Sequence, residues 1–483
     1  MEDSFNTLEP LTDIEENSKF NFKFCSIYKK TAYIAGAIII LLIVLIVIIL
    51  VSVSGVSKNK DNSDNTKNTN NPEIPDNPDK QTETTCEQGE EDLCKKCDGN
   101  KCVSCNDKYN LVNGVCEPMF DIKSIYTVNS YDEKVTLFNE PYNEYITQME
   151  VDGQNVTPSN NYKFPQLGNH TIYYSIKNEQ LDSFSKMFYQ IDKLTSILFT
   201  KKLDTKNIVS MERMFVHCNS LTFVDMSHFN IENVKNLDYF MYDSNNLVSL
   251  KLPKSRAQNL EKANHMFSQC QKLTSIDFTN FTVNSKNLTE FHGAFKNCYQ
   301  LEYVNLTNFN FQEATDMDEL FFDCHSLKSI DFPDMRTNKL KTMNKIFYGC
   351  NSLKSLNLSN FNTENVVDMN YLFYNCSSLV NIDVSSFNTK NVQYMTKFFY
   401  GCSSLVSVDL SNFNTEKVLK LNGMFEKCTH LSYIDISNFS NNAQNYFEFF
   451  TDLPAEGTIK LNMKIYEKIQ NYIPSNWEKK YVD

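Results

Sequence analysis

The sequence predicts an α/β solenoid of about ten 26-residue units, preceded by a single membrane-spanning helix, a small cysteine-rich module and a small β-sandwich. Three observations carry this prediction. Cysteines recur mostly 26 residues apart in the C-terminal half, each interval combines a β-type run with helix-like apolar spacing, and residues 32–53 form one uncharged apolar stretch. The 483 residues are 41% hydrophobic and 13% aromatic, which is enough for a large core.

The composition argues against a nucleic-acid partner. The net charge is −13, and only three of the 46 basic residues are arginines, namely Arg213, Arg256 and Arg336. Nucleic-acid binders concentrate basic side chains on one face, so we expect no nucleic-acid binding.

The N-terminal region predicts a membrane anchor. Residues 32–53 carry no charge and are long enough to cross a bilayer as a helix. They are longer, and lie further from the N-terminus, than the apolar part of a cleaved signal peptide. We therefore expect a cytoplasmic tail at residues 1–31 and a transmembrane signal anchor at residues 32–53. The chain would be a single-pass type II protein of the plasma membrane, with its C-terminal ectodomain outside.

Two short segments follow the apolar stretch. Residues 54–85 are almost free of apolar side chains, which predicts a disordered stalk. Residues 86–117 hold six cysteines, which favour three disulfides of unknown pairing: Cys86, Cys94, Cys97, Cys102, Cys105 and Cys116. This module resembles the furin- or EGF-like modules of protist surface proteins. A zinc site remains an alternative, because the module contains two Cys-x2-Cys pairs, although they are close together for a zinc ribbon.

Residues 118–182 have a strand-rich sequence pattern. Runs such as "IKSIYTV", "YITQMEV" and "HTIYYSI" are separated by turn material such as "VDGQN". They predict a small β-sandwich that would also shield the first unit of the solenoid.

Residues 183–460 repeat themselves. The repeat cysteines are Cys218, Cys270, Cys298, Cys324, Cys350, Cys376, Cys402 and Cys428. In the unit "LVNIDVSSFNTKNVQYMTKFFYGC", the run 382–384 alternates as a strand should. Thr389 then fits the N-cap of a helix. The apolar side chains that would form its buried face recur at three- and four-residue steps: Val392, Met395, Phe398 and Phe399.

The repeat cysteine is expected at a buried corner. A small, weakly polar thiol suits such a place, and free cysteine is among the most buried residue types. Ser244 and Ile191 stand at equivalent positions, so sulfur chemistry is not required there. We expect free thiols, although a spacing of about 5 Å between turns leaves disulfides open on distance alone.

The repeat residues resemble a known repeat family. The stretch "SLVSVDLSNFNTEKVLKLNGMFEKCTHL" is similar to the BspA-type leucine-rich repeat of bacterial and protist surface proteins. The resemblance implies a horseshoe with strands on its concave side and a role in adhesion or recognition. It supplies no catalytic residue and no cofactor, so we expect no enzyme. Departures at residues 251–255 and at Pro333 should distort the strand face, and residues 461–483 resemble a C-terminal cap.

Neither a catalytic nor a metal site is expected. The histidines considered, such as His217, His265, His325 and His430, lie at different distances from their nearest repeat cysteine. Side chains at different phases should project from different faces and not converge. No glycine-rich phosphate loop or nucleophile elbow appears.

A ligand site is predicted on the strand face of the later units. Aspartates stack there, and a hydroxyl residue follows each of them two positions on: Asp383, Asp409, Asp435, Ser385, Ser411 and Ser437. Repelling carboxylates would attract cations or basic surfaces. The alternative is that these acids only cap turns and bond neighbouring hydroxyls.

N-glycosylation is predicted at sequons on the outside of the protein, namely at Asn155, Asn169, Asn280, Asn287, Asn305, Asn357 and Asn438. The expected function is cell-surface adhesion or recognition of extracellular protein, glycan or matrix partners by a membrane-anchored ectodomain. The alternative is a structural surface-coat protein that self-associates without a specific ligand.

Overall fold

The computed structural model describes residues 94–98, 101–112, 115–131, 133–177, 179–283 and 286–482. The predicted tail at 1–31, the apolar span at 32–53 and the stalk at 54–85 lie outside these residues, as does Cys86. The chain divides into two units, and the described residues all belong to the second, residues 83–483.

The membrane part of the predicted fold class and location is contradicted. None of the helices in the described ranges has the length and apolar character needed to cross a bilayer. The α-helix present there, α2 (Met463–Ile469), has seven residues, far fewer than a span requires. The single-pass plasma-membrane prediction is therefore withdrawn.

The cysteine-rich module consists of two antiparallel hairpins. Strands β1 (Cys94–Asp98) and β2 (Lys101–Cys105) form the first, and β3 (Tyr109–Val112) and β4 (Val115–Pro118) form the second. One disulfide, Cys94–Cys102, closes the first hairpin, and another, Cys105–Cys116, ties the two hairpins together.

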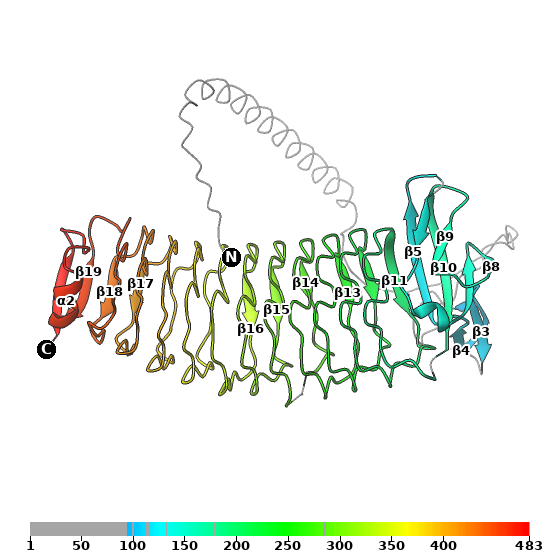
Figure 1. The fold of residues 1–483 in the computed structure, drawn as a ribbon, viewed down its shortest axis with the longest axis horizontal. Coiled ribbons are helices and arrows are strands. Elements are labelled where there is room, and N and C mark those ends of the chain that lie inside the picture. Colours follow the sequence, from blue (N-terminus) through cyan, green and yellow to red (C-terminus); the bar gives the residue numbers. More distant parts are fainter. Residues whose placement is uncertain are drawn as a thin grey trace, which may run out of the picture. The chain divides into compact units, whose positions relative to one another are not determined.

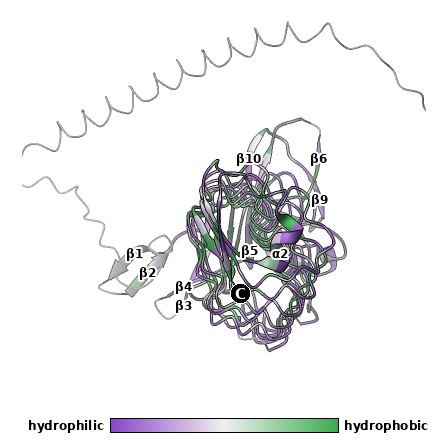
Figure 2. Ribbon diagram, turned by 90° about the vertical axis from the view of Figure 1, so that its left-hand side faces the viewer, coloured by the Kyte–Doolittle hydropathy of each residue, from purple (hydrophilic) through white to green (hydrophobic). Residues whose placement is uncertain are grey.

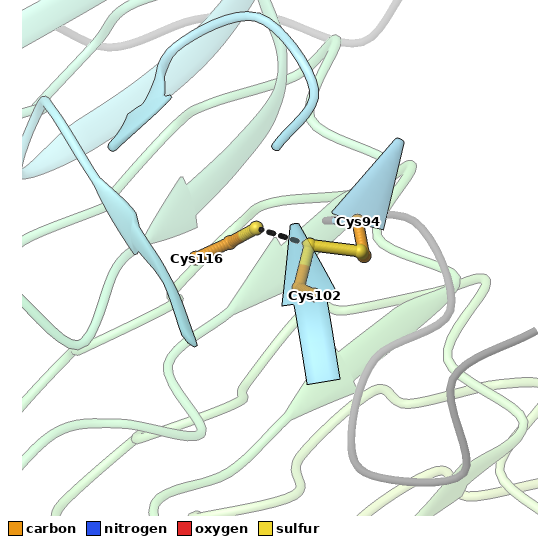
Figure 3. Close-up of side chains that lie close together, drawn as sticks. All are labelled: Cys94, Cys102 and Cys116. Atoms are coloured by element: carbon orange, nitrogen blue, oxygen red, sulfur yellow. Dashed lines mark hydrogen bonds between the residues drawn. A yellow bond between two sulfur atoms is a disulfide. The ribbon is translucent and has the colours of Figure 1, made fainter. Parts of the chain in front are cut away.

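The prediction of disulfides is thus confirmed in the described part of the module. Figure 3 shows the Cys94–Cys102 bond, with the sulfur of Cys116 lying 3.3 Å from that of Cys102. The zinc alternative required thiolates at three of these positions, and a sulfur in a disulfide is not a thiolate. The side chain of Cys97 lies outside the described part.

A β-sheet joins the N-terminal region to the solenoid. Its seven strands run in the order β13-β12-β11-β5-β10-β7-β8, and β5 pairs antiparallel with β11, the first strand of the solenoid. The strands before the solenoid are β5 (Ile122–Val128), β6 (Lys134–Thr136), β7 (Ile146–Val151), β8 (Gln154–Val156), β9 (Asn161–Lys163) and β10 (Gly168–Ile176). A 3-10 helix, η1 (Tyr142–Glu144), precedes β7, and β6 pairs with β9. Through β5, this region covers the open edge of the first turn.

The solenoid turns follow one another in a row in Figure 1, and in the end view of Figure 2 they overlie one another. Its strands are short and lie parallel in neighbouring turns: β11 (Leu194–Phe199), β12 (Phe223–Asp225), β13 (Ser249–Lys251), β14 (Ser275–Ile276), β15 (Tyr303–Asn305), β16 (Ser329–Asp331), β17 (Ser407–Asp409) and β18 (Tyr433–Ile436). The prediction of about ten repeated turns is confirmed.

The predicted helix in each turn is wrong, so the fold is a β-solenoid and not an α/β solenoid. Backbone N–H groups of Tyr371 and Phe373 donate to the carbonyls of Thr396 and Phe398 in the next turn, both over 2.9 Å. A helix would instead direct them to the residue four positions earlier. Lys397 (φ 52°) and its counterparts adopt left-handed backbone angles that interrupt a right-handed helix.

The predicted helix cap has a different role. The hydroxyl of Thr389 accepts a bond from the N–H of Asn414 over 2.8 Å and donates to the carbonyl of the same residue over 3.0 Å. Thr337 and Thr363 make the same pair of bonds to the following turn. These buried threonines therefore connect neighbouring turns.

The repeat cysteines also connect turns, and all eight are buried free thiols. The thiol of Cys402 donates to the carbonyl of Phe373 over 3.1 Å, and the other seven make the corresponding bond to the turn before. At the position without a cysteine, the Ser244 hydroxyl donates to the carbonyl of Phe215 over 2.7 Å. The expectation of a buried corner holds, and the structure adds a hydrogen bond to it.

The strand face is interrupted near two prolines. β13 ends two residues before Pro253 and is not paired with β14, while β16 ends two residues before Pro333 and has no following strand in its sheet. Proline has no N–H to donate and restricts the residue before it. The expected distortion is present at Pro253, whereas the gap after β16 continues through the next two turns, which contain no proline, and is therefore not specific to Pro333.

The C-terminal end is closed by β19 (Thr458–Asn462), α2 and β20 (Glu478–Val482), with β19 and β20 parallel to β18. Trp477 is buried there, and its indole N–H donates to the carbonyl of Pro454 over 2.9 Å.

Candidate functional site

The carboxylates of the predicted acidic site on the strand face already accept hydrogen bonds from neighbouring residues. Asp383 and Asp409 are exposed, and each accepts the backbone N–H of the serine two residues on over 2.9 Å. The bonds from Ser385 hold the pKa of Asp383 below its ordinary value. The turn-capping alternative therefore describes these carboxylates.

Asp435 does not belong to an open acidic surface. It pairs with Asp409 in the parallel ladder of β17 and β18, but it is only 2% exposed. Burial would raise its pKa, yet hydrogen bonds from Ser437 and from Lys460, 2.9 Å away, outweigh burial and lower it. The structure thus brings the predicted residues onto one face while one of the three charges is neutralised.

A groove of about 440 Å³ lies elsewhere on the turns, at a position the sequence prediction did not select. Its lining residues come from four consecutive turns: Asp368, Asn370, Tyr371, Tyr394, Thr396, Lys420, Asn422 and Asn445. Four of them are successive members of a parallel bridge ladder that runs along the solenoid: Asp368, Tyr394, Lys420 and Asn445. We call this site the groove.

Hydrogen bonds fix the polar side chains of the groove. The Asn370 Oδ1 accepts the N–H of Thr396 over 2.7 Å, and the Asn422 Oδ1 accepts the Thr396 hydroxyl over 3.2 Å. Asn445 accepts the N–H of Phe447 over 2.9 Å. Because the amide oxygens are used in this way, the amide nitrogens of the three asparagines are the groups left to donate.

An aromatic stack, defined as Phe322, Tyr348, Tyr374 and Tyr400, runs along the turns beside this ladder. Its successive ring centroids are 4.5, 4.4 and 4.3 Å apart, and the ring planes are within 9° of parallel. Lysines lie over the terminal rings, with the Lys397 ammonium 4.4 Å from the centre of Tyr400. Tyr371 of the groove packs edge-on against Tyr374 at 5.8 Å, so the stack supports one wall of the groove.

A polar cluster lies two turns before the groove. One donor atom from each of His292, Asp316 and Asp318 lies within 4.8 Å of the others. His265 stands beside them, with its ring centre 5.1 Å from that of His292, an adjacency that the sequence comparison of phases did not anticipate. Burial raises the pKa of Asp318 to about 6 and lowers that of His265 to about 4. Asp318 accepts the Thr342 hydroxyl over 2.6 Å, and Asp316 lies 3.4 Å from His292, so internal bonds account for the arrangement without an ion.

The sequon asparagines lie at or near the surface. Asn305 is half-buried, and the remaining six are exposed: Asn155, Asn169, Asn280, Asn287, Asn357 and Asn438. In Asn357 the side-chain oxygen accepts the hydroxyl of Ser359, the sequon's own third residue, over 2.7 Å.

The family comparison places this solenoid among known sequences. The model of a family described as "Mycoplasma protein of unknown function, DUF285" matches residues 171–281, 265–379 and 341–458. These overlapping matches together span more than half of the chain. The chain belongs to the DUF285 family. For the DUF285 chain, the BspA-type resemblance is therefore supported only as a repeat solenoid, because the matched family is described by another name.

Three solved structures are similar to this DUF285 chain over more than half of its length, at low sequence identity. The pneumococcal vaccine antigen PcpA is 15% identical, with 55% of this chain and 78% of that chain covered and a TM-score of 0.24. The TLR13–ssRNA13 complex is 16% identical, with 61% of this chain and 52% of that chain covered and a TM-score of 0.22. The protein LIC12759 of Leptospira interrogans is 13% identical, with 55% of this chain and 90% of that chain covered and a TM-score of 0.14. No curated protein matches the chain.

Proposed function

We propose that this DUF285 protein is an extracellular recognition protein that binds a partner in the groove. The observation that carries the proposal is the groove itself, in which bonds to their oxygens hold the asparagine side chains in place, while within the described part of the chain no hydrogen bond engages their amide nitrogens. Preorganised donors on a rigid scaffold are what a binding site requires, because little ordering remains when the partner arrives.

The disulfides support an extracellular setting. Two bonds close a module of only some twenty residues, and such bonds persist in oxidising compartments. The eight repeat thiols are consistent with the same setting because burial raises their pKa values and shields them from oxidants.

Binding, rather than catalysis, fits the chemistry of the groove. Its lining contains neither histidine nor cysteine. The carboxylate there, Asp368, accepts the N–H of Asn370 over 2.8 Å and the amide of Asn344 over 3.3 Å, so both its oxygens already have partners. A nucleophile paired with a base is absent from these lining residues.

The coat-protein alternative requires open ends through which copies could add to each other. The first turn is instead covered by β5, and the last strand, β20, presents Glu478 and Lys480 at its edge. Charged residues on an edge strand oppose end-to-end pairing. We therefore favour a partner-binding protein over a self-assembling coat.

The test compares two faces of the same protein. The full-length chain carrying Tyr394→Ala and Asn422→Ala would be applied, with a fluorescent label, to a panel of intact cells and immobilised matrix proteins. The matched control carries Asp383→Ala and Asp409→Ala on the strand face. We expect the groove variant to lose saturable binding and the strand-face variant to keep it. The reverse result would place recognition on the strand face and overturn the proposal.

A further inference from the structure

We infer that the groove takes an acidic saccharide, that is, a glycan ending in a carboxylate-bearing sugar. This inference rests on the proposed function and deepens it by naming the class of ligand. It follows from three properties of the lining residues: their excess of donors, their aromatic rings and their unpaired cation.

The groove is rich in hydrogen-bond donors. The three asparagine oxygens are used within the protein, and Asp368 has both oxygens engaged. What remains for a ligand is mainly the three amide nitrogens and the ammonium of Lys420. A ligand with many oxygen acceptors matches this surface.

The aromatic rings favour a sugar among the acceptor-rich ligands. Tyr394 packs against no other aromatic ring among the described residues, so its π-face is not taken up by another ring, and Tyr371 stands next to it in the groove. The face of an aromatic ring is electron-rich and attracts the C–H groups of a pyranose, while its phenol reaches the hydroxyls. A free phosphate or sulfate has no apolar face to place there.

The lining disfavours a peptide as the ligand. Peptide-binding sites anchor aliphatic or aromatic side chains in desolvated pockets. None of the eight lining residues is aliphatic, and three are amides. The volume of about 440 Å³ lies in the range of small-ligand sites.

Lys420 selects the charge of the sugar. It is exposed, and it makes no ion pair within the described ranges. Nearby Lys390 and Lys397, by contrast, are paired with Glu364 and Glu426. An unpaired ammonium among the lining residues of a donor-rich groove is the complement of a carboxylate.

The experiment uses two probes that differ only in the acidic sugar, 3′-sialyllactose and lactose, titrated into the purified full-length chain by calorimetry and saturation-transfer NMR. We expect 3′-sialyllactose to bind at least tenfold more tightly than lactose. Lys420→Gln should remove about tenfold of that affinity and leave lactose unchanged, since one charge-assisted hydrogen bond is lost. Tyr394→Ala should remove binding of both sugars, and Lys390→Gln serves as the matched control without effect.

The outcomes separate the two proposals. If the groove variants lose cell binding but neither sugar binds, or an acidic peptide competes where the sugar does not, the saccharide inference is overturned and the proposed function stands. If 3′-sialyllactose binds through Lys420 while cell binding ignores the groove, the inference stands and the proposed function falls. Equal binding of the two sugars would overturn the acidic part of the inference.

Discussion

The thiol of Cys376 donates a hydrogen bond over 3.1 Å to the backbone carbonyl of Phe347 in the preceding turn. The same carbonyl also accepts the N–H of Cys350 over 3.2 Å. The cysteine is therefore a cross-turn donor in a fully buried corner, and its replacement can be predicted from the Ser244 precedent.

Replacing Cys376 by serine should be tolerated better than replacing it by alanine. The serine hydroxyl can donate to Phe347 as Ser244 does to Phe215, whereas alanine removes the donor and leaves a small void. We expect Cys376→Ser to lie within about 1 kcal/mol of the wild type and Cys376→Ala to cost about 1–2 kcal/mol. Urea unfolding followed by circular dichroism measures both. If the alanine variant is the more stable, the hydrogen bond contributes nothing.

The repeat thiols should be unreactive in the folded protein. Burial raises the pKa of Cys218 and of Cys298 to about 12, and that of the other six in the same direction. Because the thiolate is the reactive form, alkylation at pH 8 should label none of the eight within the time that labels a denatured sample fully. Mass spectrometry counts the labels, and rapid labelling of the native protein would contradict the burial described above.

Asp318 should lower stability as the pH rises. Its folded pKa, about 6, lies above the ordinary aspartate value of 3.8, so between these values the folded chain binds more protons than the unfolded chain. The free energy of unfolding then falls with pH across this window. His265, with its pKa lowered from 6.5 to about 4, acts in the opposite direction over nearly the same range.

The variant Asp318→Asn removes the contribution that makes the free energy of unfolding fall with pH and leaves the opposite contribution of His265 in place. Its free energy of unfolding should rise more steeply between pH 4 and 6 than that of the wild type and be greater by about 1–2 kcal/mol at pH 7. Asp409→Asn, at an exposed position, is the control. A pH profile parallel to that of the wild type would show that Asp318 titrates normally.

Lys460 should matter more to stability than an ordinary surface lysine. It neutralises Asp435, which is buried, so Lys460→Met leaves that carboxylate without its cation and should cost about 1–3 kcal/mol at pH 7. Since the pair lowers the pKa of Asp435, its contribution is present above the unfolded value near 4 and is lost as the pH falls below it. The Met variant should therefore be closer to the wild type at pH 3 than at pH 7, and a constant difference would argue against the ion pair.

Tyr374 should be held by its ring rather than by its hydroxyl. It stacks between Tyr348 and Tyr400, and each such contact contributes about 0.5–1.5 kcal/mol beyond burial. Tyr374→Phe should be nearly neutral and Tyr374→Leu should cost about 1–2 kcal/mol in thermal unfolding. Equal stability of the two variants would show that apolar area alone sustains the stack.

The inward residues of the solenoid could be predicted from sequence, but the backbone between them could not. Val392, Met395 and Phe398 are buried as expected. Their three-residue steps are shared by an α-helix and by consecutive tight turns, so spacing alone did not separate the two. The deciding feature is the left-handed backbone at Lys397, where a lysine gives no signal, whereas Gly401 at 69° is a weak one.

The groove was missed because its residues share a turn position and not a residue type. Tyr394 and Lys420 look like unrelated surface residues until the bridge ladder places them side by side. The one available signal was that the residue immediately before each inward Met369, Met395 and Leu421 carries a polar group, namely Asp368, Tyr394 and Lys420. Likewise the adjacency of His265 and His292 was not predicted, because the 28-residue interval between Cys270 and Cys298 places the two histidines five and six residues before their respective cysteines.

That longer interval shows how the cross-turn donors accommodate changes in length. Although two residues are added before Cys298, its thiol still donates to Phe267 over 3.1 Å, at a separation of 31 residues instead of the usual 29. The extra chain is absorbed between the fixed points and does not shift the turns that follow. Because each turn offers the next one the same carbonyl acceptor, a complete turn is the step in which this solenoid can be lengthened or shortened without disturbing the bonds on either side.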